Sequence, residues 1–502
     1  YKGVSIRQVT DFLEKNQDKH YKLLTTPEGF TKIKEAMQAV DIDMYAECFI
    51  LFDECEKLVQ DVHYRDSIRE PMNDFFRFRD KALISATPIV PEKDNRFDGF
   101  TRVLIQPDYA YQQKLKLITT NNVLATLQEV IEAKRGTVCI FCNSIDSIDS
   151  FYRLIPELNN ACTFCSEDGQ YKLWKGNRRK KSIMITELER YNFFTSRFYS
   201  AVDIVCKNPP HVILINDLYG ATQSVIDPAT EAIQIIGRFR GGVNTVTHIA
   251  SIRPDLECMS ANEIDSWIEG AASIFNGWKK QLARTSNIGE RTLLQEAIGE
   301  NSYLPYLDAN GKPDPFLIAN LYEKEQVKRL YTSADLLCNA YQQTDYFAFS
   351  HEERLMPVSD NERMAIQHRL AKKKRAQLIV HKLEEMEKMS RATDKKLQKR
   401  YQRMLGNLIT TTTDRYLYDC FCRFGGDFIR ESDYNENKLR TALNVSSEHT
   451  IKQSGQMKIS IQRTFPIDSE LSVQEAKSML KQVYKKMGLN TERGITTKEL
   501  EQ

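Results

Sequence analysis

Two adjacent carboxylates, Asp53 and Glu54, stand where they could take part in chemistry. They follow the apolar run Cys48–Phe52, which has the composition of a strand buried in a sheet. In open parallel sheets, ligands bind beyond the carboxyl ends of the strands. One carboxylate there can hold Mg²⁺ through water and the next can orient an attacking water, as nucleotide hydrolysis requires. An acidic pair after a strand is also typical of a helix N-cap, so the pattern alone leaves both interpretations open.

Two further segments carry polar residues at the expected ends of elements. Ser85-Ala86-Thr87 follows a second strand-like run, and a simple turn is the alternative interpretation there. A later helix-like stretch ends in Gln234-Ile-Ile-Gly237-Arg238-Phe-Arg240. Arginines in this position can reach a γ-phosphate from a neighbouring domain. A basic helix end that is stabilised by the helix dipole is the alternative.

The elements that must position these residues alternate in the first 250 residues. Helix-like stretches such as Asn122–Ala133 and Pro228–Ile236 separate short apolar runs, which is typical of parallel α/β sheets. The charged, proline-containing stretch Pro88–Asp108 indicates a domain boundary. The runs that predict strands are Cys48–Phe52, Ala82–Ser85, Thr137–Phe141, Ala161–Phe164, Asn192–Thr195, Val212–Ile215 and Thr245–Ala250.

After about residue 254 the pattern changes to long helices with few strands. The stretch Asn361–Leu408 contains no proline and carries apolar residues at helical spacing, so it predicts one or two long basic helices. The last segment predicts a short strand at Met457–Gln462 and a helix at Ser472–Met487.

The order and spacing of the three polar segments resemble motifs II, III and VI of the superfamily-2 helicases and translocases. Further segments then match that family: Thr25–Glu28 is similar to its Thr-Pro element, and Ile140–Ser144 to the opening strand of its second motor domain. Phe194–Ser196 with Ala201–Asp203 resembles motif V. The resemblance covers roughly residues 20–250.

The resemblance implies an α/β fold with two RecA-like parallel-sheet domains, the first one incomplete, and a mainly α-helical C-terminal region. The predicted divisions are residues 1–105 and 106–253 for the two motor domains, 254–360 for a helical accessory region, 361–410 for a long basic helical segment and 411–502 for a small α+β region.

The resemblance also assigns roles around ATP bound in the cleft between the motor domains. Asp53 would hold Mg²⁺ through water, and Glu54 would activate the attacking water. Arg238 and Arg240 would contact the γ-phosphate, beside Gln234 of the same motif. Ser85, Ala86 and Thr87 would couple hydrolysis to domain movement, and Gly237 and Asp203 would adjoin the nucleotide.

Nucleic acid is the partner that the resemblance implies, with Thr26, Pro27, Asn143, Thr195 and Ser196 along its backbone. The basic run of Lys372, Lys373, Lys374 and Arg375 could hold phosphates too, although a solvated helix face is the alternative. The compressed Gly-Arg-Phe-Arg element is similar to that of herpesvirus-type origin-binding helicases. It favours DNA over RNA and makes replication or mobile-element partners conceivable.

The sequence departs from the family pattern at three points. Residue 56 is Glu, where the named subgroups carry Asp or His, and Ala201 stands where motif V usually has Gly. No Gly-x-x-x-x-Gly-Lys-Ser/Thr loop occurs to wrap the phosphates. We expect this loop upstream of Tyr1, and we expect the chain as given to hydrolyse ATP poorly.

Two other functions stay open at this stage. One is a translocase that moves on duplex without unwinding it, and the other is a non-enzymatic scaffold built on a decayed motor. No apolar run approaches the roughly 20 residues that span a bilayer. Eleven cysteines in apolar settings favour a reducing compartment, hence the cytoplasm.

Two rival sites are weighed against packing in a core. Cys139-x-x-Cys142 and Cys162-x-x-Cys165 match a zinc-ribbon spacing, but side chains three apart on a strand point to opposite faces. Tyr341, Tyr346 and Phe347 could stack bases, whereas aromatic clusters near helices are more often core.

Overall fold

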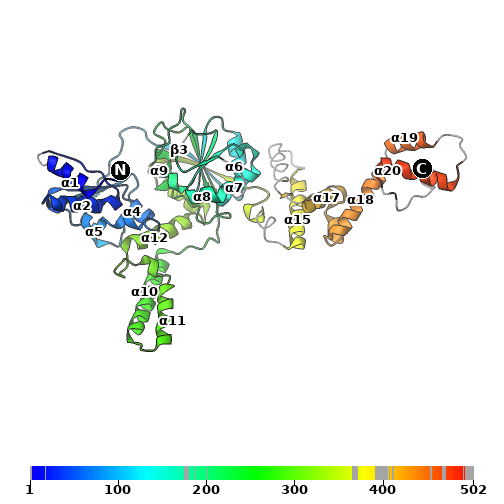
Figure 1. Cartoon of the computed structure of the whole chain (residues 1–502). Coiled ribbons are helices and arrows are strands. Elements are labelled where there is room, and N and C mark those ends of the chain that lie inside the picture. The colour runs from blue at the N-terminus through cyan, green and yellow to red at the C-terminus, as the bar shows by residue number, and fades with distance from the viewer. Residues whose placement is uncertain are drawn as a thin grey trace. The chain divides into compact units, whose positions relative to one another are not determined.

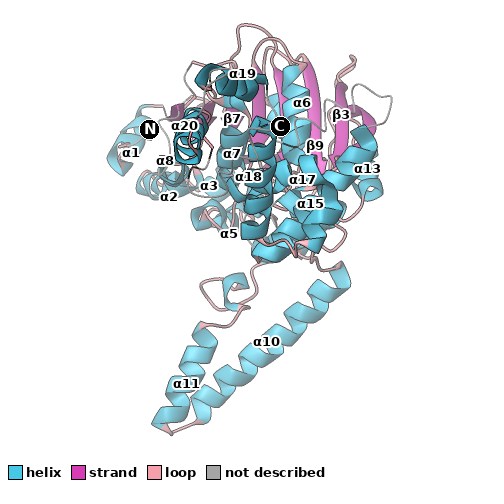
Figure 2. Ribbon diagram, turned by 90° about the vertical axis from the view of Figure 1, so that its right-hand side faces the viewer, coloured by secondary structure: helices cyan, strands magenta, loops and turns pink. Residues whose placement is uncertain are grey.

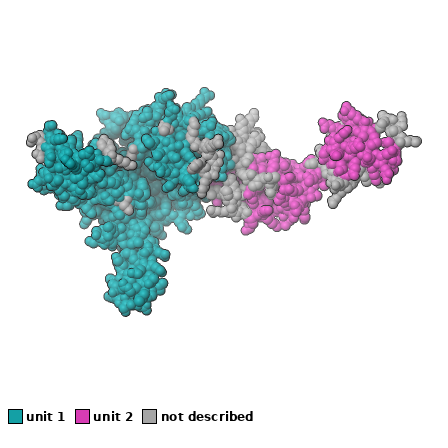
Figure 3. Space-filling view, in the orientation of Figure 1, with its two compact units in different colours: residues 1–355 teal, residues 356–502 magenta. Residues whose placement is uncertain are grey.

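The computed structural model describes residues 3–16, 19–174, 180–185, 187–200, 202–363, 371–390, 405, 408–409, 412–452, 455–465, 471–489 and 491. The chain forms two compact units, Tyr1–Leu355 and Met356–Gln502 (Figure 3). The fold of unit 1 is α/β, as predicted, with a large parallel sheet.

Unit 1 opens with a small sheet of two parallel strands, β1 (Phe49–Asp53) and β2 (Asp80–Ile84). One face packs on apolar neighbours through Ile50, Phe52 and Leu83. The other face leaves Phe49 62%, Leu51 52% and Ile84 47% exposed, although parallel sheets are normally covered on both faces. The helices around this sheet are α1 (Ile6–Lys15), α2 (Phe30–Ala39), α3 (Met44–Glu47), α4 (Lys57–Gln60) and α5 (Met72–Phe75).

The larger sheet of unit 1 has eight parallel strands in the order β10-β3-β9-β8-β4-β7-β5-β6 (Figure 1). Its central strands are apolar and fully buried, which is what a strand covered on both faces requires. The strands are β3 (Gln113–Thr120), β4 (Val138–Cys142), β5 (Cys162–Phe164), β6 (Lys180–Ser182), β7 (Tyr191–Phe194), β8 (His211–Asn216), β9 (Thr245–Ser251) and β10 (Phe347–Arg354).

Helices cover both faces of this sheet and make two separate cores. On one face, strand residues such as Ile140 pack with α6 (Val123–Glu132) and α7 (Ile145–Leu154). On the other face, residues such as Phe141 pack with α9 (Glu231–Gly237) and α13 (Ala334–Gln342). A shorter helix, α8 (Glu167–Trp174), follows β5.

The seven predicted strands are confirmed within one or two residues, as is the helix predicted at Asn122–Ala133; the helix predicted at Pro228–Ile236 is confirmed but begins three residues later, at Glu231. Three strands were not predicted: β3, β6 and β10. The edge strand β10 carries the polar sequence of Phe347–Arg354, so it lacks an apolar run. It lies in the stretch 254–360 that was predicted to be helical, yet it pairs with β3 in the sheet.

Between β9 and β10 the chain forms a helical excursion. Figure 2 shows α10 (Ala261–Arg284) and α11 (Ile288–Gly299) as a hairpin that projects from the rest of unit 1. Helix α12 (Pro315–Leu330) returns to the unit and packs against α4.

Unit 2 is helical in its described residues. Arg375 on α15 forms an ion pair with the buried Asp414 on α17, which joins these two helices. The helices are α15 (Lys372–Ser390), α17 (Thr412–Glu431), α18 (Glu436–Lys452), α19 (Gly455–Thr464) and α20 (Val473–Lys486).

The predicted strand Met457–Gln462 is wrong, because these residues form α19. Met457 and Ile461 lie one helical turn apart and pack against α20, while Ile459 between them is 50% exposed. An alternating apolar pattern over so few residues also fits a helix face. The predicted helix Ser472–Met487 is confirmed as α20, and Ser472 closes a capping box with Glu475.

Among the described residues, no helix is both long enough and apolar enough to cross a membrane.

Candidate functional site

The turn after β1 holds the predicted acidic pair at the carboxyl end of the small sheet. Asp53 is the last residue of β1 and is exposed. Glu54 adopts a left-handed backbone conformation with φ +52°, which costs a non-glycine residue on the order of 1 kcal/mol or more. Asp53 Oδ1 accepts a hydrogen bond from the Glu54 amide at 2.9 Å and supports this turn.

A buried amide connects the turns after β1 and β2 to the second sheet. Gln234 Nε2, on α9, donates to Glu56 Oε1 and to Thr87 Oγ1, both at 2.8 Å. The Thr87 amide donates in turn to Ser85 Oγ at 2.9 Å. The three segments that were predicted to act together therefore meet at one side chain.

Glu56 is 1% exposed, and burial raises the pKa of its carboxyl above the usual value of 4.5. Within the part of the chain that the structure describes, its Oε2 has no hydrogen-bond partner. Both observations disfavour the charged form, because a buried carboxylate needs partners that replace water.

The two predicted arginines occupy different surroundings. Arg238 Nη1 lies 3.9 Å from Glu54 Oε1, and the Arg238 side chain is largely buried. Arg240 is exposed and pairs with Asp203 at 2.9 Å. Arg238 thus faces the acidic turn, while Arg240 joins α9 to the segment after β7.

Asp53 is suited to contribute one ligand to a metal rather than to form a cage. No group of three or more His, Cys, Asp or Glu side chains that could hold a metal occurs among the described residues. Mg²⁺ commonly keeps several waters and takes one or two carboxylates together with substrate phosphates, so a single exposed carboxylate fits that mode.

A second polar network ties the helical excursion to the acidic turn. Gln60 Nε2, at the end of α4, donates to Thr230 Oγ1 at 3.1 Å and to Glu323 Oε1 at 3.2 Å. Asn320 Nδ2 donates to the Val59 carbonyl at 2.7 Å. These hydrogen bonds therefore hold helix α12 against α4, the helix that directly follows Glu56.

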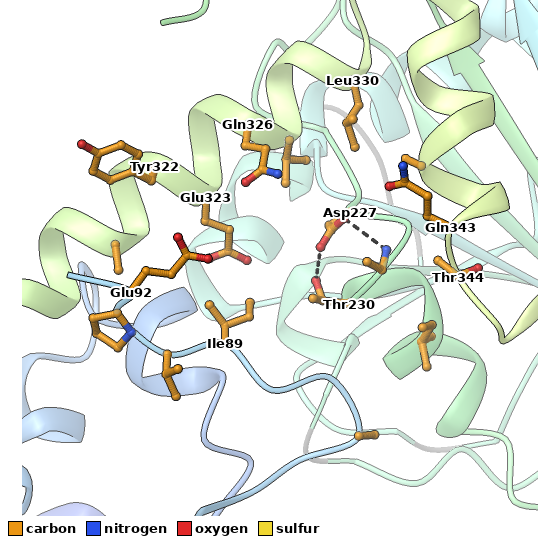
Figure 4. Close-up of a pocket in the computed structure, with 18 of the residues that line it drawn as sticks. Ile89, Glu92, Asp227, Thr230, Tyr322, Glu323, Gln326, Leu330, Gln343 and Thr344 are labelled. Carbon is orange, nitrogen blue, oxygen red and sulfur yellow. Dashed lines mark hydrogen bonds between the residues drawn. The ribbon is translucent and has the colours of Figure 1, made fainter. Parts of the chain in front are cut away.

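Beside this network lies a large cavity of about 1520 Å³, bounded by the segment after β2, the start of α9 and the helices α10, α12 and α13 (Figure 4). Figure 4 shows that Glu92, Asp227 and Glu323 line it together with apolar side chains such as Ile89 and Leu330. Its carboxylates would repel a polyanion.

Burial raises the pKa of three carboxyl groups here. The pKa of Glu323 rises to about 7, and that of Glu231 at the start of α9 also rises to about 7. The pKa of Asp227 is raised as well, although Thr230 donates a hydrogen bond to it at 2.7 Å. Because the unfolded chain has its acidic groups near their ordinary pKa values, these groups favour folding most at low pH.

The residues that were predicted to meet nucleic acid lie in several places. Asn143 follows β4 and Thr195 follows β7, and these parallel neighbours end at the same edge of the sheet. Ser196 begins a short 3₁₀ helix there. Thr26 and Pro27 begin another 3₁₀ helix in the N-terminal part of unit 1.

In the basic run of unit 2, Lys372 and Lys374 are exposed, and Lys373 pairs with the exposed Asp433. Arg375 is engaged by Asp414, so it supports the packing of its own unit. Three groups of residues from the sequence analysis lie outside the described residues. Residues 391–404 and 178–179 belong to basic segments, and residue 201 belongs to the segment that resembles motif V.

Two rival sites turn out to be core. Cys139 packs in one core of the large sheet and Cys142 in the other, on opposite faces, as the strand geometry predicted. Tyr341 and Phe347 are buried, and the Tyr341 hydroxyl bonds His248 Nδ1 at 2.7 Å.

Sequence reasoning gave no role to Glu56, Gln60 and Glu323. A signal existed for Glu56, because Asp or His stands at this position in the named subgroups of the family that the sequence resembles, but Glu departs from that pattern. No local signal existed for Gln60 and Glu323, which are 263 residues apart in the chain.

No known protein family matches this sequence, and no curated protein is similar to it.

We expect Glu56→Gln to remove a pH-dependent loss of stability. The wild-type carboxyl has a raised pKa, so its contribution is full below about 4.5 and is lost as pH rises through its folded value. The amide keeps an acceptor for Gln234 and carries no charge. The melting temperature, measured from about pH 5 to about pH 8, should therefore fall less in the variant. An exposed control, Glu70→Gln, should follow the wild type; parallel curves for all three proteins would contradict the assignment.

We expect Glu323→Gln to stabilise the protein mainly above neutral pH. The pKa of Glu323 is about 7, so the wild-type group becomes charged beside Asp227 as pH rises through that value. Below about 4.5 the neutral acid and the amide should be nearly equivalent. The melting temperatures of variant and wild type should diverge near pH 7, and the exposed control Glu353→Gln should show no such divergence.

Proposed function

We propose that this chain is part of an ATP-driven nucleic-acid motor of the superfamily-2 type, with two RecA-like domains in unit 1. The observation that carries the proposal is the single amide of Gln234, which bonds both Glu56 and Thr87. Three separate motif-like segments converge there, and the convergence involves residues from two sheets. The alternative interpretations treat the three segments as an acidic N-cap, a plain turn and a basic helix end. If those interpretations were right, nothing would require the segments to meet.

The chain's own residues would divide the chemistry among them. When bound, ATP would supply the phosphoryl group, and Mg²⁺ would neutralise the negative charge of the phosphates. Asp53 would hold the metal through water, and Glu54 would orient the attacking water and accept its proton. Arg238 would stabilise charge that develops on the γ-phosphate, because its guanidinium already faces Glu54. Arg240, paired with Asp203, would reach the phosphate only after a rearrangement.

Coupling to movement would run through Gln234. A change around the phosphate shifts Glu54 and Arg238, and Gln234 lies one helical turn before Arg238. Its bonds to Glu56 and Thr87 would be remade when the two sheets move relative to each other. Nucleic acid would then be tracked by Asn143 and Thr195 at the shared edge of the large sheet.

The phosphate-binding loop would come from a further strand and helix that extend the small sheet. The exposed face formed by Phe49, Leu51 and Ile84 is where such an element would pack. A parallel sheet of two strands with one bare apolar face is not expected to be stable alone. The same addition would bring backbone amides to the phosphates beside Asp53.

When the proposed phosphate-binding loop is present, DNA is expected to stimulate ATP hydrolysis. Glu54→Gln should lower kcat by roughly 10²–10⁴-fold, because it removes the group that accepts the proton. Arg238→Ala should lower kcat by roughly 10³-fold or more, as for other arginine fingers. Steady-state ATP hydrolysis with and without DNA measures both effects.

Arg153→Ala is the matched control for this experiment. Arg153 lies on α7, is largely exposed and forms an ion pair with Asp149 of the same helix at 3.0 Å. Its kcat should stay near that of the wild type. DNA-stimulated turnover that survives Glu54→Gln would refute the proposed mechanism, and a protein that carries the loop but has no ATPase activity would refute the motor itself.

Strand separation, rather than movement along intact duplex, is the activity that we propose. The protein should displace one strand of a partial DNA duplex in an ATP-dependent reaction that Glu54→Gln abolishes. A triplex-displacement assay under the same conditions is the comparison. Displacement of a third strand without separation of the duplex would identify a translocase instead.

A further inference from the structure

The hairpin of α10 and α11, here called the arm, is built to reach away from unit 1. Helix α10 has 24 residues, a length of about 36 Å, and it buries only Ile264 and Phe275. Helix α11 has no buried residue. Helices gain most of their stability from packing an apolar face, so an arm with so little packing indicates another use for its surface.

The turn at the tip of the arm is held rigidly by its own side chains. Glu290 accepts hydrogen bonds from Gln281 Nε2 at 2.6 Å and from Thr285 Oγ1 at 2.5 Å, and these bonds lower its pKa. Arg291 Nη1 donates to the carbonyls of Leu282 and Thr285 at 3.4 and 3.3 Å. The one carboxylate and one of the cations at the tip are therefore engaged in forming the turn.

The remaining cations at the tip are available to a partner. Lys280 and Arg284 lie one helical turn apart, are exposed, and form no ion pair among the residues that the structure describes. They line a shallow hollow together with Gly277, Gln281, Thr285 and the carboxylate of Glu290, which is engaged by Gln281 and Thr285. A Cβ at Gly277 would meet no neighbouring atom, so the hollow is open on that side.

The charge along α10 is separated from one end to the other. Asp265 and Glu269, near the base, line the acidic cavity, while Lys279, Lys280 and Arg284 stand near the tip. Lys279 also lies over the Phe275 ring. A polyanion would be repelled at the base and attracted at the tip.

We propose that the tip of the arm binds the phosphate backbone of nucleic acid, with Lys280 and Arg284 as the two cations of a phosphate site. This inference rests on the proposed motor function and adds to it a contact outside the two sheets. Lysine and arginine in a shallow hollow suit phosphate oxygens, and such contacts are independent of base sequence.

A protein partner is the rival occupant, because Ile288 and Leu293 on α11 are 81% and 68% exposed. Lys280 and Arg284, which form no ion pair among the described residues, favour phosphate over a protein. A protein that contacted only the apolar residues would leave both cations without a binding partner. The two occupants differ in how binding depends on salt.

The test is equilibrium binding of a mixed-sequence DNA duplex to the chain, without ATP, over a series of salt concentrations. Each phosphate contact contributes about −0.9 to the slope of log K against log salt. The double variant Lys280→Ala/Arg284→Ala should therefore weaken binding and reduce the magnitude of the slope by about 1.8. Its melting temperature should equal that of the wild type, since both side chains are exposed.

The matched control removes one arginine and one lysine elsewhere, as Arg7→Ala/Lys15→Ala on α1, where both side chains are exposed. It should leave the slope unchanged. A wild type that binds DNA, with the same affinity and slope in the arm variant, would overturn this inference and point to a protein partner, while the motor proposal would stand. A wild type that binds no nucleic acid would overturn both.

Discussion

In unit 1, the placement of the turns after β1 and β2 against α9 depends on one buried hydrogen-bond donor, the Nε2 of Gln234. Its two acceptors, Glu56 and Thr87, lie 178 and 147 residues away in the segments that follow β1 and β2, while Gln234 lies on α9, which packs on the large sheet. A buried amide that loses its partners costs on the order of 1–3 kcal/mol. The turns after β1 and β2 are therefore held in one arrangement relative to α9, and Arg238 follows one turn later on the same helix.

The hydrogen bonding at this contact is incomplete. Gln234 presents an oxygen as well as its amide, and that oxygen has no partner among the described residues, like Oε2 of Glu56. Two buried acceptors without donors make this arrangement less favourable than a fully satisfied one. Because two acceptors already lack donors, the hydrogen bonds of this junction can be broken and re-formed at a modest cost in free energy. An interface between moving parts requires such bonds. The junction of α12 with α4 through Gln60 and Asn320 would carry such a movement to the helical excursion.

The sequence was sufficient to predict those strands whose burial on both faces requires a continuous apolar run. Strands such as β4 and β8 are buried on both faces and read as continuous apolar runs, so their positions could be predicted. The convergence on α9 was expected only because the resemblance supplied the order of the segments, and the structure brings Gln234 and Arg238 to the acidic turn.

Other features could not be predicted, for reasons that are physical. Strand β10 alternates polar residues at the edge of the sheet, and β3 begins with exposed lysines, so neither forms an apolar run. The bonds of Gln60 to Thr230 and Glu323 depend on tertiary packing between distant helices. Glu56 has a role that depends on burial, which its residue type does not reveal. Arg375 reads as a free cation in the sequence, but it is satisfied by a buried aspartate.

The distribution of charge constrains where a polyanion could lie on unit 1. The large cavity beside α12 has the volume to hold a ligand, yet Glu92, Asp227 and Glu323 line it, and two of these groups have raised pKa values because of burial. A phosphate backbone placed there would raise those pKa values further, and Lys93, which also lines the cavity, is already paired with Asp265. The carboxyl ends of β4 and β7 carry neutral residues instead, with the partly exposed Asn143 and the buried Thr195, whose hydroxyl donates to the Phe164 carbonyl. On the proposed motor function, nucleic acid would run along that edge rather than through the acidic cavity, because the carboxylates there would repel its phosphates.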